Sequence, residues 1–374
     1  MGDIRIRPED VGTVTLPKEI KDDYVILDGL TGYTVDGIKF SNDTHDKDML
    51  LLKNCKNCII SNCKFSGKST KGNFIKLIGE NTEGNLIDHC EFTDHTFTKE
   101  NGGESIRIGN SDASGLWFKT TIQNCYFHDL AADDEDVSIK SCGNVLQNNR
   151  HENCKSSFTI RHGGSNRIQN NVFIGYGGIR VYGDGNHIIG NVHLNNNYLQ
   201  FKDEDDKEKY KLPLTISNGN LEDDINFSSE STPSGKLGCT HAVYARVKNN
   251  VIKDNTFYNC EGTCVVWGNK KYDEVKVCND KKLKVEEPLP PTRNMLINNL
   301  IAVDDGRGDS TLVVFNAGVT SEVAKSNNTF EYNKYCNAKL GEIPQKPDED
   351  KLTARPEFPI PDVWPPVKLE EIVS

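Results

Sequence analysis

The chain has 374 residues, enough for two domains of ordinary size or for one long repetitive domain. Its 44 Lys and Arg residues against 55 Asp and Glu give a net charge of −11, which disfavours a nucleic-acid-binding protein that relies on a basic surface. No apolar run is long enough to cross a bilayer as a helix, so a membrane-spanning helix is excluded.

Asparagine is unusually frequent, with 39 residues, and it recurs in a short motif in which apolar and polar residues alternate. Because the early copies recur every 20–35 residues and show no helical periodicity, they predict stacked β coils; the longer later spacings mark loops inserted between coils. Asn suits the bends, where a left-handed conformation is needed, and its amide can pair with the Asn of the next coil. The expected fold is an all-β, single-domain, right-handed parallel β-helix of about ten or more coils. The copies lie at 33–40, 57–65, 85–92, 121–127, 144–151, 166–173, 186–193, 250–257, 294–301 and, weakly, 327–330.

Twelve cysteines are spread along the chain, and several occupy the same place in the repeat, as Cys63, Cys90 and Cys125 do. Cysteines that recur with a repeat predict buried thiols stacked in the interior better than a disulfide framework. Cys55 and Cys58 form one Cys-x-x-Cys pair, but no second pair at zinc spacing completes a metal site.

The coils are expected to span residues 1–340, with an inserted loop at about 200–238. This loop carries a charge run and then a Ser-rich stretch. The Pro-rich tail at 341–374 cannot join a β ladder, so it is expected to pack on the outside of the solenoid.

A second recurrence places an Ile before a cation and a Gly after it, at Arg107, Lys140, Arg161 and Arg180. These cations are 33, 21 and 19 residues apart, close to one coil each, which predicts a ladder of positive charges on one face. A single cation on a strand is usually a solvated edge residue. Four like charges in register repel one another and are not needed for folding, so the ladder predicts binding of a polyanion.

Acidic residues precede Lys140 at Asp133, Asp134, Glu135 and Asp136. Asp133 and Glu135 are two residues apart, so on a strand their carboxylates point to the same side. Together with the amide oxygen of Asn101, about one coil earlier, they predict a hard-oxygen site suited to Ca²⁺. An acidic run is more often a solvated turn, but its position beside the cations favours the metal site.

The segments 101–109, 135–144, 159–163 and 177–183 resemble polysaccharide lyase family 6, the family of alginate lyases and chondroitinase B. The resemblance covers roughly residues 25–302 and implies β-elimination of a uronic-acid polymer with Ca²⁺ on the substrate carboxylate. It implies that Lys140 is the base that removes the C5 proton and that Arg161 protonates the leaving oxygen or stabilises its charge.

The same resemblance implies that Asp133 and Glu135 bind the metal, with Asn101 as the third ligand. The family usually has Glu at the position of Asp133, and the shorter side chain could weaken or reposition the ion. The nearby metal and Arg161 are expected to lower the pKa of Lys140. The residues expected to bind neighbouring sugars are Arg107, His162, Arg180, Tyr182 and His187.

Alginate is the favoured substrate, because most family members resemble alginate lyases and no extra C-terminal domain of the chondroitinase type is seen. A dermatan sulfate lyase and a non-catalytic polysaccharide-binding solenoid are the alternatives. A polygalacturonase-type hydrolase is disfavoured, since its Asn-Thr-Asp, Gly-His-Gly and Arg-Ile-Lys segments are missing. A monomer is expected. The first residues do not read as a signal peptide, but a secreted or periplasmic protein is expected because polymers do not enter cells intact.

Overall fold

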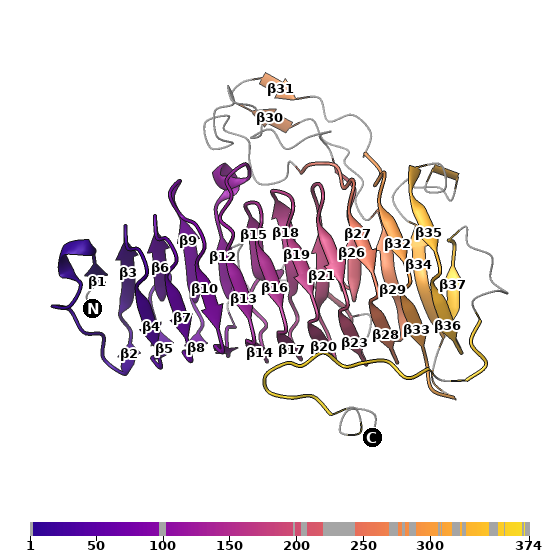
Figure 1. The fold of residues 1–374 in the computed structure, drawn as a ribbon, viewed down its shortest axis with the longest axis horizontal. Helices are drawn as coiled ribbons and strands as arrows, with labels where there is room; N and C mark the ends of the chain where they lie inside the picture. The colour runs from indigo at the N-terminus through magenta and orange to yellow at the C-terminus, as the bar shows by residue number, and fades with distance from the viewer. Residues whose placement is uncertain are drawn as a thin grey trace.

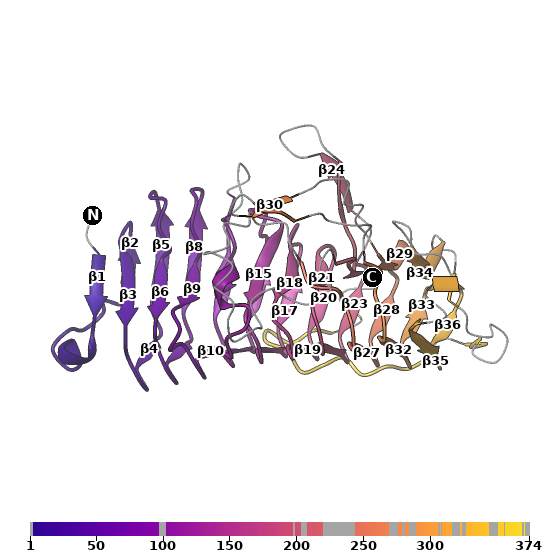
Figure 2. The same cartoon turned by 90° about the horizontal axis from the view of Figure 1, so that it is seen from above.

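The computed structural model describes residues 3–96, 102–196, 199–202, 208–219, 244–268, 276–278, 281–283, 289–305, 307, 309–315, 322–323, 327–343, 351–354, 356–368 and 370. The chain winds into an elongated rod of three parallel sheets with 12, 10 and 11 strands, and its first and last strands lie at opposite ends (Figures 1 and 2). Each coil adds one strand to each sheet in turn. The predicted right-handed parallel β-helix is therefore confirmed.

The 12-stranded sheet, called sheet I, holds the catalytic candidates. Its strands are β1 (Asp3–Ile6), β3 (Tyr24–Asp28), β6 (Leu50–Lys53), β9 (Ile75–Ile78), β12 (Ile106–Ile108), β15 (Glu135–Lys140), β18 (Ser157–His162), β21 (Gly178–Val181), β26 (Leu214–Ile216), β29 (Gly262–Trp267), β34 (Ser310–Phe315) and β37 (Lys339–Gly341).

Sheet II has 10 strands, most of three residues with the middle side chain buried. They are β4 (Thr34–Asp36), β7 (Ile59–Ser61), β10 (Leu86–Asp88), β13 (Thr121–Gln123), β16 (Val145–Gln147), β19 (Arg167–Gln169), β22 (His187–Ile189), β27 (Val251–Lys253), β32 (Met295–Ile297) and β35 (Thr329–Glu331).

Sheet III has 11 strands, and its inward side chains form a column of stacked rings that includes Phe65, Phe92 and Phe127. The strands are β2 (Glu19–Lys21), β5 (Lys39–Asp43), β8 (Lys64–Lys68), β11 (Glu91–Thr93), β14 (Tyr126–His128), β17 (Arg150–Glu152), β20 (Val172–Ile174), β23 (Val192–Leu194), β28 (Thr256–Tyr258), β33 (Leu300–Ala302) and β36 (Lys334–Cys336).

Asparagine has two separate roles at the bends between sheets II and III. Asn148 and Asn170 have φ of 55° and 54°, the left-handed conformation that Asn tolerates better than most residues. The residue that follows each of them points inward and stacks: Asn149 Nδ2 donates to Asn171 Oδ1 at 2.9 Å, and Asn171 Nδ2 to Asn191 Oδ1 at 2.9 Å. This ladder continues through Asn255, Asn299 and Asn333. The predicted stacking is confirmed, and it explains why Asn-Asn pairs recur.

In the earlier coils a cysteine replaces the stacking asparagine, and Cys125 is the last of these before Asn149 takes over the column. Its thiol donates to the carbonyl of Gln123 at 3.1 Å. The ten cysteines whose side chains are described are all free and buried, so the prediction of stacked interior thiols is confirmed for them. Cys239 and the side chain of Cys278 lie outside the described residues.

The described parts of the tail lie along the outside of sheet III (Figure 1). Val363 packs in an apolar cluster with Val172 and Val192, and Arg150 donates to the carbonyl of Pro366 at 3.1 Å. Residues 344–350, 355, 369 and 371–374 of the expected tail lie outside the described residues.

Of the expected insertion at 200–238, residues 203–207 and 220–238 lie outside the described ranges. Its described part forms an antiparallel pair, β24 (Leu199–Lys202) with β25 (Glu208–Lys211), before the chain returns to sheet I as β26. A second pair, β30 (Lys276–Cys278) with β31 (Lys281–Leu283), projects from the rod (Figure 1). Two short 3-10 helices lie at Pro8–Asp10 and Ser111–Ala113, and within the described ranges no helix has the length and apolarity to cross a membrane.

Candidate active site

Four neighbouring strands near the middle of sheet I, β12, β15, β18 and β21, bring the predicted cations together on its outer face. Arg107 is in register with Ser138, Ser138 with Thr159, and Thr159 with Arg180. Lys140 lies two residues beyond Ser138, on the same face because side chains of a strand alternate. The expected single ladder of four cations is therefore wrong, since Lys140 and Arg161 lie further along their strands than Arg107 and Arg180.

A β-bulge accounts for the position of Arg161. The pairing of β15 with β18 shifts between Ile139 and Lys140, so that Lys140 is opposite His162 and Arg161 is the extra residue. Bulges of this kind redirect a side chain next to a site, and no spacing in the sequence reveals them.

Two buried carboxylates separate the cations, which explains why folding tolerates so many like charges. Glu104 is fully buried, and its Oε1 lies 3.8 Å from Arg107 Nε and 3.8 Å from Lys140 Nζ. Glu135 pairs with Arg161, 3.3 Å from its Oε1, and with Arg180 through the same oxygen. Glu104 was missed by the sequence analysis, because its burial depends on the neighbouring coil.

Lys140 has the properties of a general base. It is only 2% exposed, and burial, together with the charges of Arg107 and Arg161, lowers the pKa of its ammonium to about 8 against the opposing effect of Glu104 and Glu135. A lysine with this pKa is neutral in about one molecule in ten at about pH 7, far more often than an ordinary lysine.

Arg161 behaves in the opposite way. Burial disfavours the charge of its guanidinium, but Glu135 and then Tyr244 outweigh burial and raise its pKa. Arg161 is therefore permanently charged, and it can stabilise a developing negative charge without giving up a proton.

Three acidic side chains, Glu104, Asp133 and Glu135, lie close enough to affect one another. Burial raises the pKa of Asp133 to about 6, and the charges of Glu104 and Glu135 add to this effect. Asp133 accepts hydrogen bonds from the backbone of Gly102 at 2.6 Å and of Gly103 at 3.2 Å. Both carboxylate oxygens of Glu104, and Oε2 of Glu135, are buried without a hydrogen-bond partner.

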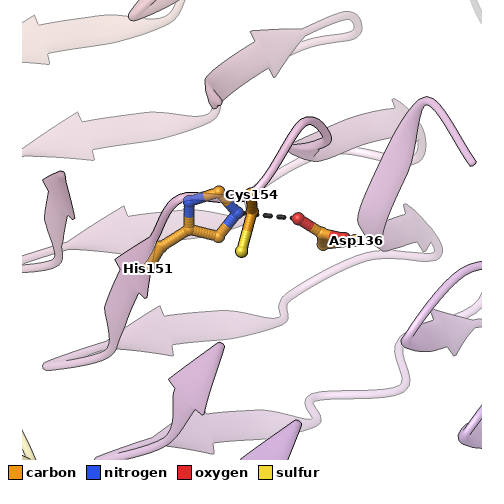
Figure 3. Close-up of side chains that lie close together, drawn as sticks. All are labelled: Asp136, His151 and Cys154. Carbon is orange, nitrogen blue, oxygen red and sulfur yellow. Dashed lines mark hydrogen bonds and ion pairs between the residues drawn. The ribbon is translucent and has the colours of Figure 1, made fainter. Parts of the chain in front are cut away.

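The predicted ligand Asn101 lies outside the described residues. Within the described ranges, the oxygens of the three carboxylates do not all come within 4.8 Å of one another. A different group has its possible ligand atoms within 4.8 Å of one another: Asp136, His151 and Cys154, which are all buried inside the solenoid (Figure 3).

The predicted sugar-binding residues fall into two places. His162 stacks on Tyr244, with ring centroids 5.6 Å apart, and Tyr182 stacks on the same ring at 4.2 Å. Tyr182 is 1% exposed and belongs to the core, so it supports the ring of Tyr244. His187 lies on β22 in sheet II, because the chain leaves sheet I at the turn after Tyr182, and the structure does not bring it to Lys140.

Tyr244 was missed by the sequence analysis. Besides the two stacked rings, it lies under the guanidinium of Arg161, 5.7 Å from the ring centroid. It follows the insertion, where the repeat spacing is lost, so no sequence signal placed it near Arg161.

Comparison with known proteins agrees with this arrangement. The family model described as chondroitinase B matches residues 31–354, most of the chain. The chain belongs to polysaccharide lyase family 6. No curated protein matches this family 6 member.

Solved structures resemble the family 6 member along most of its length. A family 6 alginate lyase in complex with a trisaccharide has a TM-score of 0.61 at 18% identity, covering 96% of this chain and 84% of that one. The family 6 lyase Pedsa3628 from Pseudopedobacter saltans has a TM-score of 0.59 at 19% identity and 99% coverage of both chains. A mannuronic-acid-specific family 6 lyase from human gut microbiota has a TM-score of 0.56 at 19% identity, covering 88% of this chain and 91% of that one. At these identities the likeness shows the shared fold.

Proposed function

We propose that this family 6 protein cleaves alginate by β-elimination, with Lys140 as the base. The observation that carries the proposal is the pairing of a buried lysine whose pKa is about 8 with the permanently charged Arg161 on the adjacent strand. β-Elimination from a uronate needs these two groups: one that accepts the C5 proton, and one that stabilises the charge on the departing oxygen.

In the proposed reaction, the neutral amine of Lys140 takes the C5 proton, and the C5–H electrons form the C4=C5 double bond. The C4–O bond breaks, and its electron pair goes to the glycosidic oxygen beside Arg161. Because the pKa of Arg161 is raised, its guanidinium keeps its proton and acts electrostatically. The leaving oxygen then takes its proton from water or from the Lys140 ammonium.

Ca²⁺ is the metal that the chemistry of the nearby donors favours. Glu104, Asp133 and Glu135 would hold it, with Asn101 as a further candidate, and all four supply the oxygen atoms that Ca²⁺ prefers. Oε2 of Glu104 and Oε2 of Glu135 support this assignment, because both are buried without a hydrogen-bond partner and buried carboxylate oxygens need a cation or a donor. A bound Ca²⁺ would neutralise the substrate carboxylate and so make the C5 proton easier to remove.

Arg107 and Arg180 are proposed to bind the carboxylates of neighbouring sugars, and His162 and the ring of Tyr244 to contact the sugars themselves. Similar solved structures support alginate over dermatan sulfate, because two of them are alginate lyases and a third is a family 6 lyase specific for mannuronic acid. A polymeric substrate also supports the proposal that the protein is exported to the periplasm or secreted.

Incubation with alginate, polymannuronate, polyguluronate, dermatan sulfate and polygalacturonate tests the proposal. We expect alginate to give a rise in ultraviolet absorbance, which marks the conjugated double bond, in step with new reducing ends. Reducing ends without absorbance would show hydrolysis and defeat the lyase. Activity confined to dermatan sulfate would defeat alginate as the substrate, and binding without cleavage would show a non-catalytic solenoid.

A further inference from the structure

Strand β15 breaks the alternation that a regular strand imposes. Glu135 points outward to Arg161 and Arg180, whereas Val137 and Ile139 belong to the core. Residues two apart on a regular strand face the same side, so Glu135 and Val137 cannot both hold these positions without an irregularity. The register of β15 against β18 shifts between these two residues, and Asp136 is the extra residue of this bulge.

The bulge turns a carboxylate into the interior of the solenoid. Asp136 is buried, and its Oδ2 lies 2.8 Å from Nε2 of His151 on β17 (Figure 3). β17 belongs to sheet III, so the hydrogen bond crosses the interior from one sheet to another. The ring of His151 is packed between aromatic side chains, with its centroid 5.1 Å from that of Phe158 and 5.3 Å from that of Phe173.

The geometry favours a hydrogen bond over a metal site, although Cys154 completes a group of three donors within 4.8 Å. Two ligands of one tetrahedral zinc ion stand roughly 3.3 Å apart, given metal–ligand bonds of about 2.0–2.1 Å. The 2.8 Å between Nε2 and Oδ2 is shorter and is the length of a hydrogen bond. The thiol of Cys154 donates to the carbonyl of Glu152 at 3.3 Å and is thus already paired.

We propose that His151 and Asp136 form an internal strut that fixes the bulge of β15 and thereby holds Glu135 on the outer face. A carboxylate in an aromatic core is unfavourable unless it is paired. Without His151, the buried carboxylate of Asp136 has no partner, so it is more favourable for Asp136 to turn outward. That turn shifts β15 by one residue and moves the neighbouring side chains to the opposite faces. Glu135 would then leave Arg161 and Arg180. His151 is a positioning residue, since it acts on the site through Asp136 and Glu135.

The chain contains a matched control in the same column of rings. His193 lies two coils further along, in register with Phe173, which is itself in register with His151. It stacks on Phe173 at 4.7 Å and on Phe257 at 4.9 Å, and burial lowers its pKa to about 3. No described carboxylate forms an ion pair with His193, so it is a packing ring. His151 and His193 share their packing role and differ in the carboxylate.

The test compares His151→Phe, His193→Phe, Asp136→Asn and Asp136→Ala in the full chain. Thermal unfolding confirms that each variant folds. Hydrogen–deuterium exchange then measures protection of the amides at 133–140, and lyase assays measure kcat and KM. His151→Phe is expected to lower kcat by about 10–100-fold, as the loss of an outer supporting partner usually does, and to increase exchange at 133–140. His193→Phe should change neither.

Asp136→Asn keeps an acceptor for the imidazole N–H and should retain kcat, whereas Asp136→Ala should lower it as His151→Phe does. If His151→Phe does not fold, the difference in kcat between Asp136→Asn and Asp136→Ala tests the strut in its place. Equal exchange and kcat in the two His→Phe variants would overturn the strut. So would one equivalent of a transition metal in the wild-type protein that His151→Phe loses.

Only the expected change in kcat rests on the proposed function, since the exchange measurement needs no activity. If the wild-type protein cleaves no polymer, the proposed function fails, and the exchange contrast still tests the strut.

Discussion

The pH dependence of the reaction should respond in opposite directions to two substitutions beside Lys140. A lysine acts as a base only when neutral, so kcat/KM should rise with pH through the pKa of Lys140, about 8, and then level off. At about pH 7 a group with this pKa is neutral in about one molecule in ten, against about one in 3000 at its ordinary value of 10.5. The surroundings of Lys140 therefore raise the neutral fraction about 300-fold.

Glu104→Gln removes a negative charge whose Oε1 lies 3.8 Å from Lys140 Nζ. At that distance two unit charges interact by about 1 kcal/mol even with the screening of bulk water, which corresponds to about 0.8 pH unit, and by more in a buried site. Since Glu104 favours the ammonium, its loss should lower the pKa of Lys140 and move the rising limb to lower pH by about one unit or more. Arg107→Gln removes a charge that disfavours the ammonium, so it should move the limb to higher pH.

The assay is the full pH profile of kcat/KM, normalised to its plateau, so that a loss of substrate or metal binding common to all pH values cancels. Lys76→Gln is the control, because Lys76 lies one coil before Arg107 in the same column and pairs with Asp48 at 3.7 Å. Its profile should match the wild type. Shifts of the same sign for Glu104→Gln and Arg107→Gln, or no shift in either, would refute the assignment of the limb to Lys140.

Three further outcomes follow from the site and the fold. Lys140→Ala should lower turnover by about 10³-fold or more, while binding of the polymer in a sedimentation assay persists. Lys140→Arg should be equally inactive, because arginine keeps its proton. Wild-type rates in either variant would remove Lys140 from the base role. Exhaustive EGTA treatment should abolish activity and lower the melting temperature, with recovery on adding Ca²⁺ but not Mg²⁺, and unchanged activity would contradict the metal assignment. Asn171→Leu removes the acceptor Oδ1, which lies 3.0 Å from the backbone N of Asn149 and 2.9 Å from its Nδ2. Chemical denaturation should therefore show a free energy of unfolding that is lower by about 2–5 kcal/mol. Asn170→Gly should be close to neutral, because Asn170 has a φ of 54°, which glycine adopts readily.

The coiled architecture could be predicted from the sequence because each repeat satisfies its own bends and pairs with its immediate neighbours. Asn171 illustrates this: its amide hydrogen bonds reach only the coils before and after, so the same residue type recurs wherever the same bend recurs. Lys140 and Arg161 could be chosen as candidates because the recurrence of Ile, cation and Gly marks them in consecutive coils, and Glu135 because it precedes Lys140 in the acidic run.

The arrangement within the site could not be predicted, because it depends on irregularities that spacing does not encode. The two shifts in the pairing of β15 with β18 place Arg161 out of register and turn Asp136 inward. Glu104 lies between Arg107 and Lys140 only after two coils have stacked, and Tyr244 reaches Arg161 across an insertion. Each of these contacts is non-local, and a single motif contains no trace of it.

The position of the four site strands along sheet I, fifth to eighth among 12, has a consequence for how the protein comes apart. A solenoid resembles a one-dimensional array in which each unit is stabilised by the two units beside it, so opening starts at the ends and propagates inward. The terminal coils therefore fray first, before the coils in the middle of the rod lose any order. The coils that carry Lys140 and Arg161, with several neighbours on either side, are the last to lose their order, and coils could be gained or lost at either end without moving Lys140 relative to Arg161.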